Sequence, residues 1–170
     1  MEPKAVAIAP MVVPRLEAEL GAAWPEKPVR IDVSDYVREI GEAYTTDYPP
    51  HTTISSRNSQ NQDIAGLEII FHEASHTMSR KIEDSLSIEC AAQKKNCGDL
   101  WHAVLFYTVG NAVKQSLPAE PTFVPYAYRF GLYNHGAWKV YRIALEKEWQ
   151  PYLDGKTEFT DTIRALVSAL

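Results

Sequence analysis

The stretch Ile64–Thr77, IAGLEIIFHEASHT, constrains the fold of this chain more than any other segment. Its apolar residues recur at the three- and four-residue spacing of one face of an α-helix. This core-facing stripe consists of Leu67, Ile70, Phe71, Ala74 and, just beyond the stretch, Met78. The polar run Arg57–Asp63 comes before it and offers several capping side chains, so we predict a helix that begins between Asn61 and Asp63.

A second face of the same helix carries the pattern His-Glu-x-x-His at His72, Glu73 and His76. Positions i and i+4 lie on one face of a helix, so both imidazoles can reach a single metal ion, with Glu73 turned toward the same open side. Two nitrogen ligands and a carboxylate that can take a proton from a metal-bound water are what a zinc hydrolase requires. The alternative is an amphipathic helix whose histidines pack or face water, but the helical context favours the metal site.

Size and composition predict a single globular domain spanning residues 1–170, with 45% hydrophobic and 23% charged residues. The net charge of −5 gives no indication of a nucleic-acid partner. No apolar run is long enough to cross a bilayer, so we expect no membrane partner. The composition does not indicate an oligomeric state.

The first twenty residues contain a short apolar segment that is interrupted by Pro3, Pro10 and Pro14. This pattern does not predict a signal peptide. Removal of a leader from a longer precursor would make the protein periplasmic or secreted, so the sequence leaves its location open. We expect a helix over residues 14–23, with the proline at its start.

The two cysteines, Cys90 and Cys97, are separated by AAQKKN. Their spacing is compatible with two ordinary thiols and equally with a disulfide that closes a small loop, which would imply an oxidising compartment. Zinc binding by this pair is disfavoured, because thiol ligands are usually about two to four residues apart.

The remaining pattern predicts an α+β fold that is mostly helical, with a small N-terminal sheet packed on the motif helix. We expect strands over residues 29–33, 43–46 and 51–56, whereas residues 34–42 fit either helix or extended structure. Further helices are expected over residues 79–94, 100–116, 137–149 and 161–170. We predict Asp99 and Thr160 as N-caps, and Pro151 as the end of the third of these helices.

A catalytic zinc site usually has three protein ligands and one open position, so a third ligand must join the two motif histidines. The candidates are His51, Glu83, Asp84, Glu89, Asp99, His102 and His135. We favour His102, because a polar ring in the first turn of the apolar helix LWHAVLFYTVG needs a partner if it is buried. The alternative for His102 is burial with a backbone or carboxylate partner. Glu89 is the second choice as a ligand.

Glu73 is the predicted general base, which would take a proton from the attacking water and pass it to the leaving group. A further donor would stabilise the developing oxyanion. The candidates for this role are Tyr107, Tyr126, Tyr128, Tyr133 and His135.

The motif His72-Glu73-Ala74-Ser75-His76, preceded by the threonine-rich segment His51–Ser56, resembles the zincin metallopeptidases. In that superfamily an edge strand ahead of the motif helix binds peptide substrates by backbone pairing, and HTTISS would be that strand here. The metzincin pattern is absent, since position 82 is Ile, and the thermolysin-like glutamate ligand is not clearly present. The segment DLWHAVLFYT is similar to segments of uncharacterised bacterial proteins of metallopeptidase type. The resemblance implies a zincin-like fold, a Zn²⁺ ion and a peptide or small amide substrate.

These observations favour a zinc-dependent hydrolase, most specifically a peptidase. One alternative is a metal-binding domain without turnover, which the presence of Glu73 argues against because a structural site needs no general base. The other alternative is a helical interaction module in which the motif is accidental.

Overall fold

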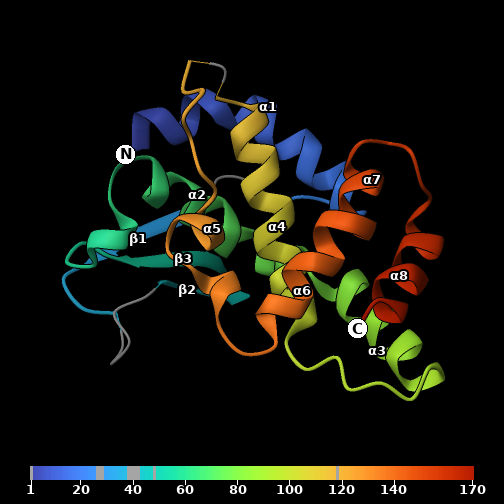
Figure 1. Ribbon diagram of the computed structural model, residues 1–170. Helices are drawn as coiled ribbons and strands as arrows, with labels where there is room; N and C mark the ends of the chain where they lie inside the picture. Colours follow the sequence, from blue (N-terminus) through green and yellow to red (C-terminus); the bar gives the residue numbers. More distant parts are fainter. Residues whose placement is uncertain (1, 26–28, 38–42, 48, 118) are drawn as a thin grey trace.

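The chain folds into a mostly helical α+β structure with a small sheet at one side of the helices (Figure 1). This computed structural model describes residues 2–25, 29–37, 43–47, 49–117 and 119–170. The helices are α1 (Glu2–Leu20), α2 (Asp63–Ser75), α3 (Arg80–Ala92), α4 (Leu100–Gln115), α5 (Tyr126–Arg129), α6 (Trp138–Ala144), α7 (Gln150–Leu153) and α8 (Phe159–Ser168). Three short 3₁₀ segments are η1 (Ser59–Asn61), η2 (His76–Met78) and η3 (Leu132–Asn134), and η4 (Leu145–Trp149) is a π-helical segment.

The described strands are β1 (Arg30–Ser34), β2 (Ala43–Asp47) and β3 (Pro50–Ser55), in the order β1-β3-β2. β1 is parallel to β3, whereas β2 is antiparallel to it. The three predicted strands are therefore confirmed to within one or two residues. Of the segment left open by the sequence, residues 38–42 lie outside the described part of the chain, as does Pro118 after α4.

The prediction that HTTISS forms an edge strand of the sheet is wrong. β3, which contains most of HTTISS, is the central strand of the described sheet and pairs on both sides. β1 and β2 are instead the two edge strands of the described sheet. The order follows from the parallel pairing of β1 with β3, a long-range contact that local sequence patterns do not predict.

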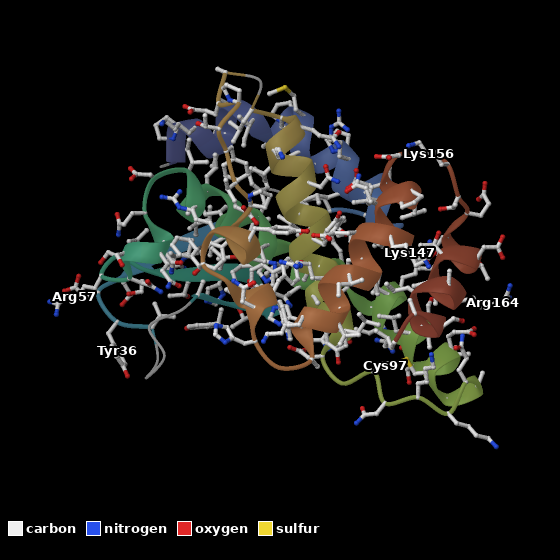
Figure 2. The ribbon with its side chains drawn as sticks, viewed as in Figure 1. Tyr36, Arg57, Cys97, Lys147, Lys156 and Arg164 are labelled. Atoms are coloured by element: carbon white, nitrogen blue, oxygen red, sulfur yellow. A yellow bond between two sulfur atoms is a disulfide. The ribbon has the colours of Figure 1, made fainter. Side chains whose placement is uncertain are left out.

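The motif helix α2 lies at the centre of the molecule, where it contacts the sheet, α1 and α4. Its predicted core stripe is confirmed, since Leu67, Ile70, Phe71, Ala74 and Met78 are all buried. The helix is in fact buried on every side from Ala65 to Ser75. Apolar side chains fill the space between the elements, whereas Arg57, Lys147, Lys156 and Arg164 point outward (Figure 2).

The first helix is longer than expected, because α1 begins at Glu2 and continues through Pro10 and Pro14. Proline lacks the backbone N–H and its ring clashes with the preceding turn, which led us to begin the helix at Pro14. The structure shows why the helix continues. One face is buried at helical spacing by Ala5, Ile8, Val12, Leu16 and Leu20, and this tertiary packing overrides the local preference.

Two predicted boundaries in the C-terminal third are also wrong. Pro151 does not end the helical run, because it occupies the start of α7 after the π-helical segment, where its missing N–H is tolerated. The last helix begins at Phe159 with Glu158 as N-cap, so Thr160 lies inside the first turn. Phe159 packs against Trp149 and Tyr152, which fixes this start.

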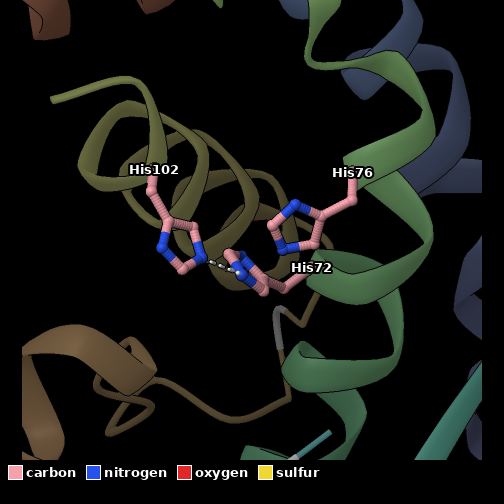
Figure 3. Close-up of side chains that lie close together, drawn as sticks. All are labelled: His72, His76 and His102. Carbon is pink, nitrogen blue, oxygen red and sulfur yellow. Dashed lines mark hydrogen bonds between the residues drawn. The ribbon is translucent and has the colours of Figure 1, made fainter. Parts of the chain in front are cut away.

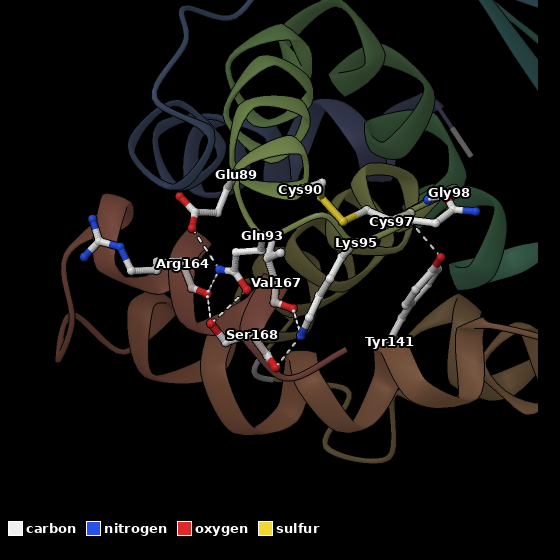
Figure 4. Close-up of a disulfide and its surroundings, with 11 residues drawn as sticks. Glu89, Cys90, Gln93, Lys95, Cys97, Gly98, Tyr141, Arg164, Val167 and Ser168 are labelled. Atoms are coloured by element: carbon white, nitrogen blue, oxygen red, sulfur yellow. Dashed lines mark hydrogen bonds between the residues drawn. A yellow bond between two sulfur atoms is a disulfide. The ribbon is translucent and has the colours of Figure 1, made fainter.

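Cys90 and Cys97 form a disulfide between the end of α3 and the loop before α4, with their Cα atoms 6.2 Å apart (Figure 4). The choice that the spacing left open is thus decided in favour of the bridge. None of the helices in the described part of the chain has the length and apolarity needed to cross a membrane.

Candidate metal centre

Three histidine rings converge on one point between α2 and α4 (Figure 3). His72 and His76 come from the motif, and His102 comes from the first turn of α4. One nitrogen from each ring lies within 4.8 Å of the others, and Nε2 of His72 is 3.1 Å from Nε2 of His102. This group could hold a metal ion.

The local structure explains how the two motif histidines face the same way. The α-helix ends at Ser75, and His76 begins a 3₁₀ turn, but its φ of −56° and ψ of −34° remain helical. The i, i+4 relationship is therefore kept, and the ring centroids of His72 and His76 are 4.9 Å apart. Packing of α4 against α2 then brings in His102.

Aromatic side chains hold two of these rings in place. The ring of Phe106 stacks on His72 with a centroid distance of 3.7 Å. Trp101 stacks on His102 at 5.0 Å. Phe106 lies one turn after His102 on α4, so the same helix supplies a ligand and the ring that packs on another ligand.

Burial favours the neutral form of two of the imidazoles, those of His72 and His102. Burial, with smaller contributions from the charges of His76 and His102, holds the pKa of His72 well below its usual range. Burial also lowers the pKa of His102 to about 4. At neutral pH each of these rings therefore carries one N–H and one lone pair, and the lone pair can bind a metal ion.

Asp99 occupies the predicted N-cap position of α4, but its side chain makes no capping hydrogen bond. Its Oδ2 lies 3.6 Å from Nδ1 of His102, and Trp138 donates a hydrogen bond to the carboxylate. Burial raises the pKa of Asp99 despite that bond. A carboxylate on the distal nitrogen of a histidine is a common outer partner of metal ligands. Nδ1 of His72 is buried without a hydrogen-bond partner among the described residues.

Glu73 lies in the wall of the cavity that contains the three histidines. Its side chain is 8% exposed, and Oε2 accepts a hydrogen bond of 3.3 Å from the hydroxyl of Thr45 on β2. Thr45 in turn shares a 3.1 Å hydrogen bond with Thr52 on β3. The small sheet therefore positions the predicted general base.

The cavity has a volume of about 670 Å³ and lies between β2, η1, α2 and α4. Its wall combines aromatic side chains with acidic ones. The acidic residues are Glu73, Glu83 and Asp99, and no lysine or arginine is among the described residues that line it. The hydroxyl of Ser79 donates to Oε1 of Glu83.

The other candidate ligands lie elsewhere or play a different part. Oε1 of Glu89 accepts a hydrogen bond from Gln93 on the outer side of α3, near α8 (Figure 4), and Glu89 is outside the metal-binding group. Asp84 pairs with Arg80, and Nδ1 of His51 lies 2.6 Å from the hydroxyl of Thr46. Glu83 and Asp99 line the cavity but do not join the histidines in the group.

Of the five candidate oxyanion donors, Tyr126 is the one that lines this cavity. Tyr107, Tyr128 and Tyr133 line a separate cavity of about 660 Å³ over the second half of α4. The hydroxyl of Tyr133 donates a hydrogen bond to the carbonyl oxygen of Ala103. His135 is exposed and lies outside both cavities.

Several residues of the cavity were not singled out from the sequence, namely Tyr44, Thr45, Gln60, Asn61, Phe106, Leu132 and Trp138. They come from five different segments that only the tertiary fold brings together. One signal was present: Asn61 falls in the polar run before the motif, where we considered only helix capping. Its side chain is buried instead.

Comparison with protein families, curated proteins and solved structures finds no match to this chain. The resemblance to zincin metallopeptidases therefore depends on the motif and on the geometry described above.

Proposed function

We propose that this protein is a zinc-dependent hydrolase with a zincin-like fold, and that it cleaves peptides or small amides. The observation that carries the proposal is the convergence of His72, His76 and His102 beside a cavity that Glu73 also lines. A motif that arose by chance would not be expected to recruit a third histidine from a distant helix.

The donor set suits zinc. Three neutral imidazoles are typical of catalytic zinc sites, with one position left for water or substrate. With Zn–N bonds of about 2.05 Å, tetrahedral geometry places ligand nitrogens about 3.3 Å apart. The 3.1 Å between the Nε2 atoms of His72 and His102 is close to this value.

A zinc ion in this position would supply a Lewis acid that lowers the pKa of a bound water and polarises the scissile carbonyl. Glu73 would take the proton from the attacking water and deliver it to the leaving nitrogen. The hydrogen bond from Thr45 would hold one carboxylate oxygen and so orient the other toward the cavity. Tyr126 would donate to the oxyanion once the side chain of Gln60, whose Oε1 lies 3.1 Å from its hydroxyl, moves aside.

The edge strand β2 is the element best placed to hold an extended substrate. Ala43, Tyr44 and Thr45 on this strand line the cavity beside Glu73. A peptide that adds to a sheet edge is held by main-chain hydrogen bonds and therefore needs little sequence specificity.

Zinc analysis and peptide cleavage test the proposal. Protein prepared without added metal and then titrated with zinc should bind one ion per chain, and His72→Ala should abolish binding. His135→Ala is the matched control, because this histidine is exposed and is not a member of the group. Glu73→Gln should keep zinc but lose cleavage of a mixed peptide library. Zinc binding that survives His72→Ala, or cleavage that survives Glu73→Gln, would refute the proposal.

A further inference from the structure

The wall of the cavity contains a buried donor without an acceptor. Asn61, in the 3₁₀ turn before α2, is 2% exposed and lines the cavity. Its Nδ2 has no hydrogen-bond partner in the part of the chain that the structure describes. Buried polar groups in folded proteins are nearly always paired, so this amide calls for an explanation.

The neighbouring groups do not satisfy Asn61. The hydroxyl of Tyr126 lies 3.1 Å from Oε1 of Gln60 and 3.5 Å from Oδ1 of Asn61. A hydroxyl has one proton to donate, and the shorter contact goes to Gln60. The oxygen of the Asn61 carboxamide therefore accepts at most a weak hydrogen bond from Tyr126. The two N–H donors of the carboxamide are left for another acceptor. Gln60 is exposed, so its side chain can move aside when a molecule enters.

The charge of the cavity limits what that acceptor can be. Glu73, Glu83 and Asp99 line the same space, and no lysine or arginine is among its described lining residues. A carboxylate or phosphate oxygen that did not contact the zinc ion would be repelled by these groups. A neutral carbonyl oxygen is a good acceptor for an amide N–H and carries no such penalty.

We infer that Asn61 binds a main-chain carbonyl of the substrate and positions it for cleavage. The inference depends on the proposed function and deepens it, because it restricts the substrate to molecules with a second, neutral carbonyl besides the scissile one. Peptides and acylated amino-acid amides fulfil this condition, whereas simple amides do not. Asn61 is a positioning residue that contacts the substrate, and it takes no part in proton transfer.

Two zinc-binding probes separate this role from the metal site. Acetohydroxamate binds a zinc ion but has no second carbonyl, whereas an N-acyl dipeptide hydroxamate carries further main-chain carbonyls. We expect the peptidyl probe to bind zinc-loaded wild-type protein more tightly than acetohydroxamate. Asn61→Leu should weaken the peptidyl probe about tenfold and leave acetohydroxamate unchanged, as measured by calorimetry.

The same variant distinguishes a substrate contact from a structural role. Replacement of an unpaired buried donor by an apolar group of similar size should leave the thermal midpoint unchanged or raise it. Where a cleaved peptide is available, KM should rise while kcat and zinc content change little. Asn61→Asp removes the same donors with a smaller change of shape and provides the answer if the leucine variant fails to fold. Ser59→Ala, an exposed change in the same turn, is the control.

Equal affinity of both Asn61 variants and the wild type for the peptidyl probe would overturn the inference. So would a loss of acetohydroxamate binding, since it would show that Asn61 acts on the metal site. Failure of the wild type to bind either probe is a distinct result, which would refute the zinc site itself.

Discussion

Oδ2 of Asp99 lies 3.6 Å from Nδ1 of His102, on the side of the imidazole away from Nε2, which faces His72. This relationship gives the carboxylate control over the tautomer of His102. A proton on Nδ1 is attracted to Asp99, and Nε2 is then left with its lone pair toward the metal position. In the proposed zinc site, Asp99 would thus act on the metal through His102.

Removal of this carboxylate should weaken zinc binding. We expect Asp99→Ala to lower zinc affinity about tenfold to a hundredfold, the range typical of outer partners of histidine ligands. Asp99→Asn keeps an acceptor oxygen and should lose less. Competition with a fluorescent chelator measures both. Asp84→Asn removes a charge from the exposed Arg80 pair and should have no effect. Equal zinc affinity in the wild type and Asp99→Ala would show that His102 needs no such partner.

The sequence predicted the cluster of three histidines better than the cavity beside it. His72 and His76 are linked by helical spacing alone, so a local pattern suffices to place them together. His102 was inferred because a polar ring in an apolar helix needs a partner, and the packing of α4 on α2 provides one. The convergence of the three rings agrees with that expectation, and metal binding by His102 stays a prediction.

The errors have a common physical origin. Strand order, the helix through Pro10, and the place of Asn61 all depend on contacts between segments far apart in the chain. β3 becomes central because β1 pairs with it in parallel, across the intervening β2 segment. Local propensity disfavours α1 at Pro10, but burial of its inner face outweighs that preference. No local pattern contains this information.

Glu68 predicts a dependence of stability on pH. It is fully buried on α2, where Oε2 accepts a hydrogen bond of 2.7 Å from the backbone N–H of Tyr126. Burial raises the pKa of Glu68 to about 8, from its ordinary value of 4.5. Between these values the folded protein keeps a proton that the unfolded chain has lost. The contribution of Glu68 to the free energy of unfolding should therefore fall as pH rises from about 4.5 to about 8, by up to about 1.4 kcal/mol per pH unit.

Glu68→Gln isolates this effect, because a carboxamide is neutral at every pH and can still accept from Tyr126. Urea denaturation at a series of pH values should show a stability difference between wild type and variant that shifts in favour of the variant as pH rises. Glu19, whose pKa burial also raises to about 7, is present in both proteins and cancels in the comparison. A pH-independent difference would show that Glu68 is ionised in the folded state.

The disulfide should contribute to stability more than to metal binding. Cys90 and Cys97 close a loop with a sequence separation of 7 residues. Loop-closure entropy for this size is worth about 2.5 kcal/mol, so the double variant Cys90→Ala, Cys97→Ala should lose about this much in the free energy of unfolding. The carbonyl oxygen of Cys97 still accepts hydrogen bonds from Tyr141 and from the backbone of Leu100, which hold the start of α4.

The zinc affinity of the double variant should therefore stay within about threefold of the wild-type affinity. Denaturation with and without a phosphine reductant provides the control, since only the wild type should respond to it. A large loss of zinc affinity on reduction would instead show that the bridge fixes His102.

The continuous helix α1 can be tested at Pro10, which is exposed within the helix. Proline there leaves the carbonyl of Val6 without its helical N–H donor, and Pro10→Ala supplies one. The gain is offset in part because alanine makes the unfolded chain more flexible. We expect a net stabilisation of about 1–2 kcal/mol in urea denaturation. Pro3→Ala, in the first turn, restores no helical bond and should change little. If Pro10→Ala destabilises the protein instead, the chain around residue 10 is not helical, and the N-terminal helix begins near Pro14 as the local pattern predicts.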